Sequence, residues 1–195
     1  MSKQVASRRL VVGISGSSAP QLGLALLRAL VDNEDVEVHL IVSHGARASI
    51  TAELGVNLAE LEELADVVHD PANLGAAVSS GSFKTDGMVV MPCSMRTLAG
   101  IASGNSADLL TRAADVCLKE RRKLVLVTRE TPLNLIHLRN METVTLAGAV
   151  VLPPVPAFYH HPKTIEDLLN QVVGKVLDQF SIEHQLFERW KGLPD

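Results

Sequence analysis

Aromatic residues are scarce in this chain of 195 residues, with four Phe, one Tyr and one Trp making up 3% of it. The core must therefore be built from Ala, Val, Leu and Ile, which suit buried parallel strands covered by helices. Only two cysteines occur, Cys93 and Cys117, which excludes a disulfide scaffold and favours a reducing compartment. We recognise no secretory signal and no apolar run long enough for a membrane span, so we expect a cytoplasmic protein without a membrane partner.

Basic residues are not in excess either. Eighteen Lys and Arg stand against 22 Asp and Glu, and the resulting net charge of −4 argues against a nucleic-acid-binding surface. The apolar content of 47% and the charged content of 21% are typical of a globular protein. At this length we expect one domain over residues 1–195, with a frayed polar terminus at 1–8 and a C-terminal tail at 181–195.

Apolar runs typical of strands alternate with segments of helical spacing along the chain. We expect strands at 10–14, 36–42, 87–91, 123–127 and 149–152, helices at 22–31, 46–54, 97–102, 109–120, 135–146 and 164–180, and short, partly helical segments between 58 and 78. Thr164 is expected to cap the last helix. The alternation predicts an α/β fold, a doubly wound and mostly parallel sheet of about six strands in a three-layer α/β/α, Rossmann-like arrangement.

Small residues follow two of these strands, where a strand ends and a helix begins. The first loop holds Gly16, Ser17 and Ser18, and the second holds Ser94 and Thr97. Helix N-termini and small side chains at this edge of a parallel sheet bind phosphates and cofactors, so the loops favour a nucleotide-type ligand. Neither a Walker loop nor G-x-G-x-x-G spacing is present. Close packing of the first loop and simple helix capping in the second are the alternatives.

A charged pair, Arg129 and Glu130, follows the strand expected at 123–127. The arginine can hold a phosphate or an electron-rich ring, and the carboxylate can take or give a proton. An exposed ion pair in a loop is the alternative. Cys93 also stands at a strand end, but without an evident His or Asn partner we interpret it as an apolar filler rather than a nucleophile.

Three further features are candidates for binding an anion. Tyr159, the only tyrosine, follows the proline-rich segment 153–156, and with Lys175 on the next helix it can clamp an anion. The basic cluster at 119–123 is interpreted mainly as a solvated last helical turn, in which Lys119 alone is a functional candidate. His160 and His161 lack partners at metal-ligand spacing, so no metal site is expected.

Five motifs occur in order over nearly the whole chain, from about residue 10 to residue 190. They are Gly-x-Ser-Gly-x-Ser, Ser-Gly-Ser-Phe-x-Thr-Asp-Gly-Met, Pro-Cys-Ser-Met-x-Thr-Leu, Arg-Ala-Ala-Asp-Val-x-Leu-Lys-Glu-x-Arg-x-Leu-Val-Leu-Val-x-Arg-Glu-x-Pro and Pro-Pro-x-Pro-Ala-Phe-Tyr. Each motif alone is weak, but the combination is specific. Together they resemble the UbiX/Pad family of flavin prenyltransferases.

This resemblance implies an activity. Members of the family join a dimethylallyl group from dimethylallyl monophosphate to N5 and C6 of reduced FMN, without a metal. The product, prenylated FMN, is passed to a UbiD-type decarboxylase. The family also suggests a homo-oligomer, a dodecamer, in which neighbouring subunits share sites.

The resemblance also assigns residues to roles. The implied FMN contacts are Gly16, Ser17, Ser18, Ser43, Ser94, Met95, Arg96, Thr97 and Arg129. The implied prenyl-phosphate contacts are Tyr159, Lys175, Arg112, Lys119, Ser80 and Gly81. Glu130, Ser18 and Lys119 would be catalytic, and Glu53 would be a second carboxylate in the pocket.

The first loop departs from the family pattern. Ala19 stands where members have a glycine, Pro20 follows it, Leu22 replaces a frequent tyrosine, and His44 a frequent lysine. Two other functions stay open. One is an FMN-dependent decarboxylase, although the residues that follow Pro92 differ from the loop typical of cysteine decarboxylases. The other is a non-catalytic flavin carrier or subunit of an aromatic-acid decarboxylase complex, which the altered loop would favour.

Overall fold

The computed structural model describes residues 8–192, and in them six strands form one sheet in which every neighbouring pair is parallel. The order is β3-β2-β1-β4-β5-β6. The strands are β1 (Arg8–Ile14), β2 (Val36–Val42), β3 (Val67–His69), β4 (Gly87–Cys93), β5 (Lys123–Thr128) and β6 (Val150–Val151). The helices are α1 (Gln21–Leu30), α2 (His44–Glu53), α3 (Leu58–Glu62), α4 (Met95–Ala102), α5 (Leu109–Lys119), α6 (Leu135–Leu146) and α7 (Ile165–Gln179), with a 3-10 turn, η1 (Ala77–Ser79).

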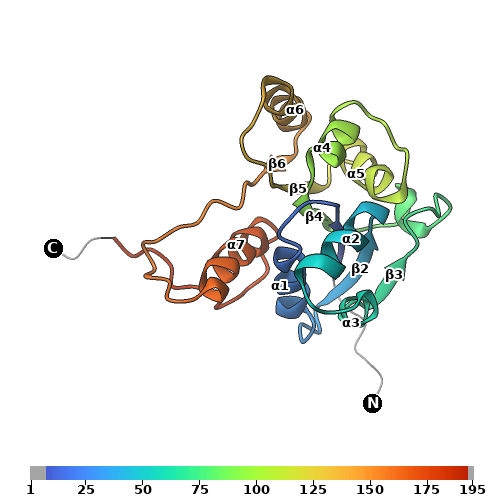
Figure 1. The fold of residues 1–195 in the computed structure, drawn as a ribbon. Coiled ribbons are helices and arrows are strands. Elements are labelled where there is room, and N and C mark those ends of the chain that lie inside the picture. Colours follow the sequence, from blue (N-terminus) through green and yellow to red (C-terminus); the bar gives the residue numbers. More distant parts are fainter. Residues whose placement is uncertain (1–7, 193–195) are drawn as a thin grey trace, which may run out of the picture.

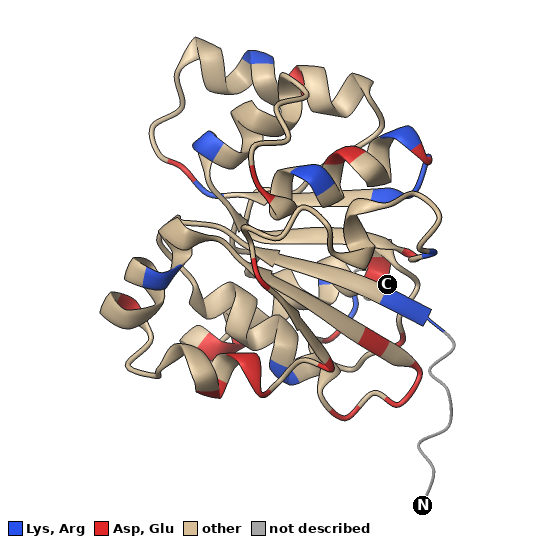
Figure 2. Ribbon diagram, turned by 90° about the vertical axis from the view of Figure 1, so that its right-hand side faces the viewer, with Lys and Arg blue, Asp and Glu red and all other residues tan. Residues whose placement is uncertain are grey.

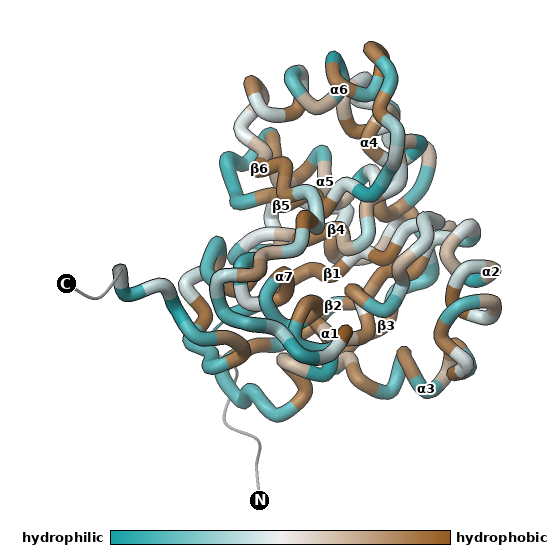
Figure 3. Tube along the Cα trace, turned by 60° about the vertical axis from the view of Figure 1, so that its left-hand side comes forward, coloured by the Kyte–Doolittle hydropathy of each residue, from teal (hydrophilic) through white to brown (hydrophobic). Residues whose placement is uncertain are grey.

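Helices cover both faces of the sheet, with α1 and α7 on one side and α4 and α5 on the other (Figure 1). Successive strand residues point to opposite faces. Val12 of β1 therefore packs with α1 and α7, whereas its neighbour Val11 packs with α4 and α5. In Figure 3 the central strands are predominantly brown, because both of their faces are buried. This is the predicted three-layer α/β/α arrangement.

The N-terminal end of the sheet corrects one expectation. Arg8 was expected to belong to a frayed terminus, but it begins β1. Its guanidinium donates hydrogen bonds to the carbonyls of Phe180 at 2.6 Å and Ser181 at 3.0 Å, which fastens the end of α7 to the sheet. Residues 1–7, the rest of that terminus, lie outside the described residues.

The prediction missed β3, which lies within the segment expected to be partly helical. The strand has only three residues, none of them fully buried, and it pairs with β2 from His39 to Ile41. Helix α7 matches the prediction, since the Thr164 hydroxyl accepts a hydrogen bond from the Asp167 amide at 3.1 Å.

The described part of the C-terminal tail packs against α7. A Cβ atom added at Gly174 would come within 2.5 Å of Phe187 Cε1 and 2.6 Å of His184 Cε1, so the tail needs a glycine there. Arg189 donates two hydrogen bonds to the Asp178 carboxylate, at 2.6 and 3.0 Å, and this holds the pKa of Asp178 below its ordinary value.

Charged residues of both signs are interspersed over the face shown in Figure 2, in keeping with the small net charge. Among residues 8–192, no helix combines the length and the apolar character needed to cross a membrane. The same residues contain no cluster of three or more His, Cys, Asp or Glu arranged to hold a metal ion.

Candidate active site

Four loops meet at the carboxyl edge of the sheet. Because β2, β1, β4 and β5 are adjacent and parallel, the residues that follow them lie side by side. The Ser43 amide donates to the Ile14 carbonyl at 2.9 Å, and the Arg129 amide donates to the Cys93 carbonyl at 3.1 Å. The predicted flavin contacts after all four strands are therefore gathered at one edge.

Ser15, which was not predicted, joins two of these loops. It is only 1% exposed. Its hydroxyl donates to the Pro92 carbonyl at 2.9 Å and accepts from the Ser94 amide at 2.8 Å. The Ser17 hydroxyl makes a similar link to the Arg129 carbonyl at 3.0 Å. A hydroxyl residue directly after an apolar strand was the available signal for Ser15.

Gly16 lets the first loop cross the start of α2 at close range. A Cβ atom at Gly16 would lie 2.7 Å from the Gly45 carbonyl carbon and 2.8 Å from its oxygen. A Cβ atom at Gly45 would instead lie 3.7 Å from Gly16, an ordinary contact. The crossing therefore requires glycine on one side only, and it brings backbone rather than side chains to this edge.

Glu53 at the end of α2 holds the remainder of the first loop. Its carboxylate accepts hydrogen bonds from the Ser18 hydroxyl at 2.9 Å and from the Ala19 amide at 3.0 Å. Ala19 has φ +71°, a left-handed conformation that costs free energy for a residue with a Cβ atom. Two residues expected in the pocket, Ser18 and Glu53, are thus brought into direct contact.

The start of α4 is capped as the alternative reading of this loop expected. The Ser94 hydroxyl accepts from the Thr97 amide at 3.2 Å and donates to the Thr97 hydroxyl at 3.1 Å. Met95 is buried in the core, and Arg96 is exposed. Capping and ligand binding are compatible, because a helix N-terminus has several free amides and a positive dipole end.

The Arg129–Glu130 loop completes the edge. Glu130 is exposed, and its carboxylate accepts a hydrogen bond from the Thr131 amide at 3.0 Å. Cys93, one strand away, is fully buried, and burial raises the pKa of its thiol to about 12. A protonated, inaccessible thiol is inert, which supports the interpretation of Cys93 as an apolar filler.

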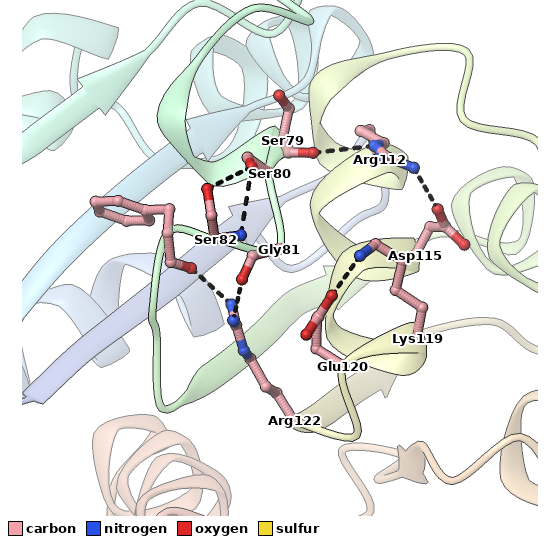
Figure 4. A network of polar contacts seen from close by, with 10 residues as sticks. Ser79, Ser80, Gly81, Ser82, Arg112, Asp115, Lys119, Glu120 and Arg122 are labelled. Atoms are coloured by element: carbon pink, nitrogen blue, oxygen red, sulfur yellow. Dashed lines mark hydrogen bonds and ion pairs between the residues drawn. The ribbon is translucent and has the colours of Figure 1, made fainter.

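A second cluster gathers four of the predicted prenyl-phosphate contacts on and beside α5 (Figure 4). Arg112 donates to the Ser79 carbonyl at 3.1 Å and pairs with Asp115 at 2.7 Å. Lys119 forms an ion pair with Glu120, whose pKa is lowered by that hydrogen bond. A Cβ atom at Gly81 would lie 2.6 Å from Lys119 Nζ, so Gly81 lies directly against this pair.

The two clusters lie at opposite ends of the strands. Lys119 ends α5 just before β5 begins at Lys123, whereas Glu130 follows the end of β5 at Thr128. A strand of six residues is about 20 Å long, so Lys119 and Glu130 do not share a pocket within one chain.

Lys175 lies on α7 and Tyr159 in the segment before it, and each has a different neighbour. The Tyr159 ring packs edge-on against Trp190, with ring centroids 6.0 Å apart, and Lys175 Nζ lies 3.8 Å from Asp178. Because α7 and α5 cover opposite faces of the sheet, Lys175 and Lys119 are also separated within one chain. Trp190 was seen in the sequence only as part of the tail.

Comparison with known proteins shows to which family the chain belongs. A family model described as Flavoprotein matches residues 1–177. The flavin prenyltransferase UbiX of Escherichia coli strain K12 is 53% identical over 187 residues, 95% of this chain and 99% of the relative. The chain belongs to the UbiX family. A probable UbiX-like flavin prenyltransferase of Sedimentibacter hydroxybenzoicus is 50% identical over 96% of this chain and 99% of the relative.

Two solved structures are similar throughout. AnUbiX (PadA1), in complex with FMN and dimethylallyl pyrophosphate, matches with a TM-score of 0.93 and 53% identity over 96% of this chain and 99% of that one. A dodecameric FMN-dependent UbiX-like decarboxylase from Escherichia coli O157:H7 matches with a TM-score of 0.92 and 50% identity, over 94% of this chain and 100% of that one. The predicted family and the predicted fold are confirmed.

Proposed function

We propose that this enzyme transfers a dimethylallyl group from dimethylallyl monophosphate to N5 and C6 of reduced FMN. The observation that carries the proposal is its 53% identity, over nearly the whole chain, to a flavin prenyltransferase. We further propose that the product, prenylated FMN, serves a UbiD-type decarboxylase, and that the enzyme works in the cytoplasm.

The carboxyl edge of the sheet fits FMN. The close crossing of Gly16 and Gly45 exposes backbone where a planar ring system or a phosphate can approach. The start of α4 offers amides for the phosphate, with Ser94 and Thr97 ordering that turn. Arg129 would lie against the flavin, and Ser43 would contribute from the neighbouring loop. Reduced FMN supplies an electron-rich ring as the nucleophile.

The cationic residues have a distinct task. The C–O bond of the prenyl phosphate breaks with its electron pair remaining on the phosphate, whose negative charge therefore increases. Lys119, Arg112 and Lys175 would stabilise this charge, and Tyr159 would donate a hydrogen bond. Glu130 would accept the proton released when the new ring closes.

These groups would meet in an assembly of several copies. Large apolar side chains are exposed on α6, with Leu135 at 60%, Ile136 at 67% and Leu146 at 82%, and Phe158 beside Tyr159 is 67% exposed. Exposed apolar surface of this kind marks an interface. We propose a homo-oligomer, a dodecamer as in the UbiX-like relative, in which Lys119 of one copy approaches the flavin edge of another.

The test is anaerobic incubation with reduced FMN and either dimethylallyl monophosphate or the pyrophosphate seen with the relative, followed by mass spectrometry of the flavin. We expect a flavin heavier by one five-carbon prenyl unit. A flavin of unchanged mass that stays bound would favour the carrier. The decarboxylase named for one relative is the second candidate, and release of carbon dioxide by this protein alone would support it.

A further inference from the structure

The turn formed by residues 80–83 is fastened by Arg122, which lies outside the residues assigned to the reaction. Its guanidinium donates to the Phe83 carbonyl at 2.7 Å and to the Gly81 carbonyl at 2.5 Å (Figure 4). These two carbonyls are two residues apart in one turn, so a single planar fork spans it. A lysine ammonium has no such fork and cannot reproduce the geometry.

The far end of the turn is anchored independently. The Arg9 guanidinium carbon lies over the Phe83 ring, 4.9 Å from the ring centroid. The Phe83 ring also packs edge-on against the His39 ring, with the two ring centroids 5.2 Å apart. At the near end, the Arg112 guanidinium donates a hydrogen bond to the Ser79 carbonyl at 3.1 Å. Between these fixed ends, the carbonyl of Gly81 is held by Arg122.

Gly81 in turn defines the surroundings of Lys119. The ammonium nitrogen of Lys119 would lie 2.6 Å from a Cβ atom at Gly81, so the turn backbone and the lysine are in contact. A shift of Gly81 by an ångström would either crowd the lysine or open a gap beside it. The position of the turn therefore limits the space that the Lys119–Glu120 ion pair can occupy on this side.

We propose that Arg122 is a positioning residue for the prenyl phosphate, which holds Gly81 and Ser80 in register with Lys119 without touching the substrate. This inference rests on the proposed function, because it takes Lys119 and this turn as phosphate contacts. It gives a role to an arginine that sequence reasoning placed in a solvated helix end.

Arg121 is a matched control. It is adjacent in sequence, it carries the same side chain, and it is exposed. Within residues 8–192 its side chain makes no hydrogen bond or ion pair. A general effect of removing one positive charge near Lys119 should therefore appear when either arginine is replaced. An effect of losing the contacts with the turn should appear only when Arg122 is replaced.

The experiment compares the wild type with Arg122→Gln, Arg122→Lys and Arg121→Gln. It measures kcat, the KM for dimethylallyl monophosphate, the Kd for FMN and the melting temperature. For Arg122→Gln, which removes both contacts with the turn, we expect KM to rise about tenfold or more, as for the loss of one charge-assisted contact between Lys119 and the phosphate. We also expect kcat to fall, because a displaced Lys119 stabilises the leaving phosphate less well, whereas the Kd for FMN should stay within about twofold of wild type. The KM of Arg122→Lys should lie between those of the wild type and Arg122→Gln, and the KM of Arg121→Gln should match that of the wild type.

An unchanged KM in Arg122→Gln would overturn the inference, and so would an equal rise in the KM and in the Kd for FMN, which would indicate general destabilisation. Calorimetric binding of dimethylallyl monophosphate separates this inference from the proposed function. If the wild type binds it without turnover, the function fails, and weaker binding by Arg122→Gln alone still supports Arg122. If the wild type neither binds nor reacts, both fail.

Discussion

The crossing of Gly16 and Gly45 allows a sharp test, because the two glycines face each other but differ in the space available. In Gly16→Ala, the new methyl group would lie 2.7 Å from backbone atoms of Gly45 that cannot rotate away. The first loop and the start of α2 must then separate. Overpacking of this kind costs about 1–3 kcal/mol.

Gly45→Ala places the new methyl group 3.7 Å from Gly16, which is an ordinary contact distance. Residue 45 lies within α2. Alanine is the better helix former, so this variant should gain about 0.5–1 kcal/mol. The two variants therefore add the same atoms at the same crossing and should change stability in opposite directions.

The assay is thermal melting at one protein concentration, together with FMN titration. For a chain of this size, each kcal/mol shifts the melting temperature by about 2–4 °C. We expect Gly16→Ala to lower the melting temperature and to weaken the binding of FMN at least about tenfold, which corresponds to about 1.4 kcal/mol of binding free energy. Gly45→Ala should raise the melting temperature slightly and keep FMN affinity. Equal effects in both variants, or wild-type FMN affinity in Gly16→Ala, would refute the reasoning.

Three further results are expected. Glu130→Gln should bind FMN normally but form product about 10²-fold more slowly, as expected for loss of a general acid or base; single-turnover kinetics would show this, and wild-type turnover would remove Glu130 from proton transfer. Lys175→Ala should weaken prenyl-phosphate binding by about 1.5–3 kcal/mol and spare FMN, which titration of each ligand checks. His39 and His69 share a hydrogen bond of 3.0 Å, Glu37 lies 3.5 Å from His39, and burial lowers the pKa of both histidines. The unfolded chain then binds more protons, so stability should fall as the pH drops below about 6.5, and the melting temperature of His69→Gln should fall less.

The fold was predictable where apolar periodicity was strong. The strand at 36–42 has the predicted bounds, because its apolar residues are buried along its whole length. The helix at 135–146 also has the predicted bounds, although Val144 is its one buried residue and its apolar pattern is weak. The strand Val67–His69 was not predictable from its own residues. Three partly exposed residues carry too short a pattern, and the strand exists because the edge of β2 is available for pairing.

The candidate site was predictable loop by loop but not as a whole. Strand ends followed by small or charged residues correctly indicated the edge at which Ser17, Ser94 and Arg129 meet. The contact of Arg122 with the turn about 40 residues earlier has no signal in spacing, because it depends on how α5 packs beside β4. The separation of Lys119 from Glu130 follows from topology, since one precedes β5 and the other follows it.

The most direct test of the central claim is one anaerobic reaction read in two ways. The protein is mixed with reduced FMN, dimethylallyl monophosphate and an aromatic acid, and both the flavin mass and the release of carbon dioxide are followed. The proposed function predicts a flavin heavier by one prenyl unit and no carbon dioxide until an apo UbiD-type decarboxylase is added. Carbon dioxide released by this protein alone, with the flavin mass unchanged, would contradict it.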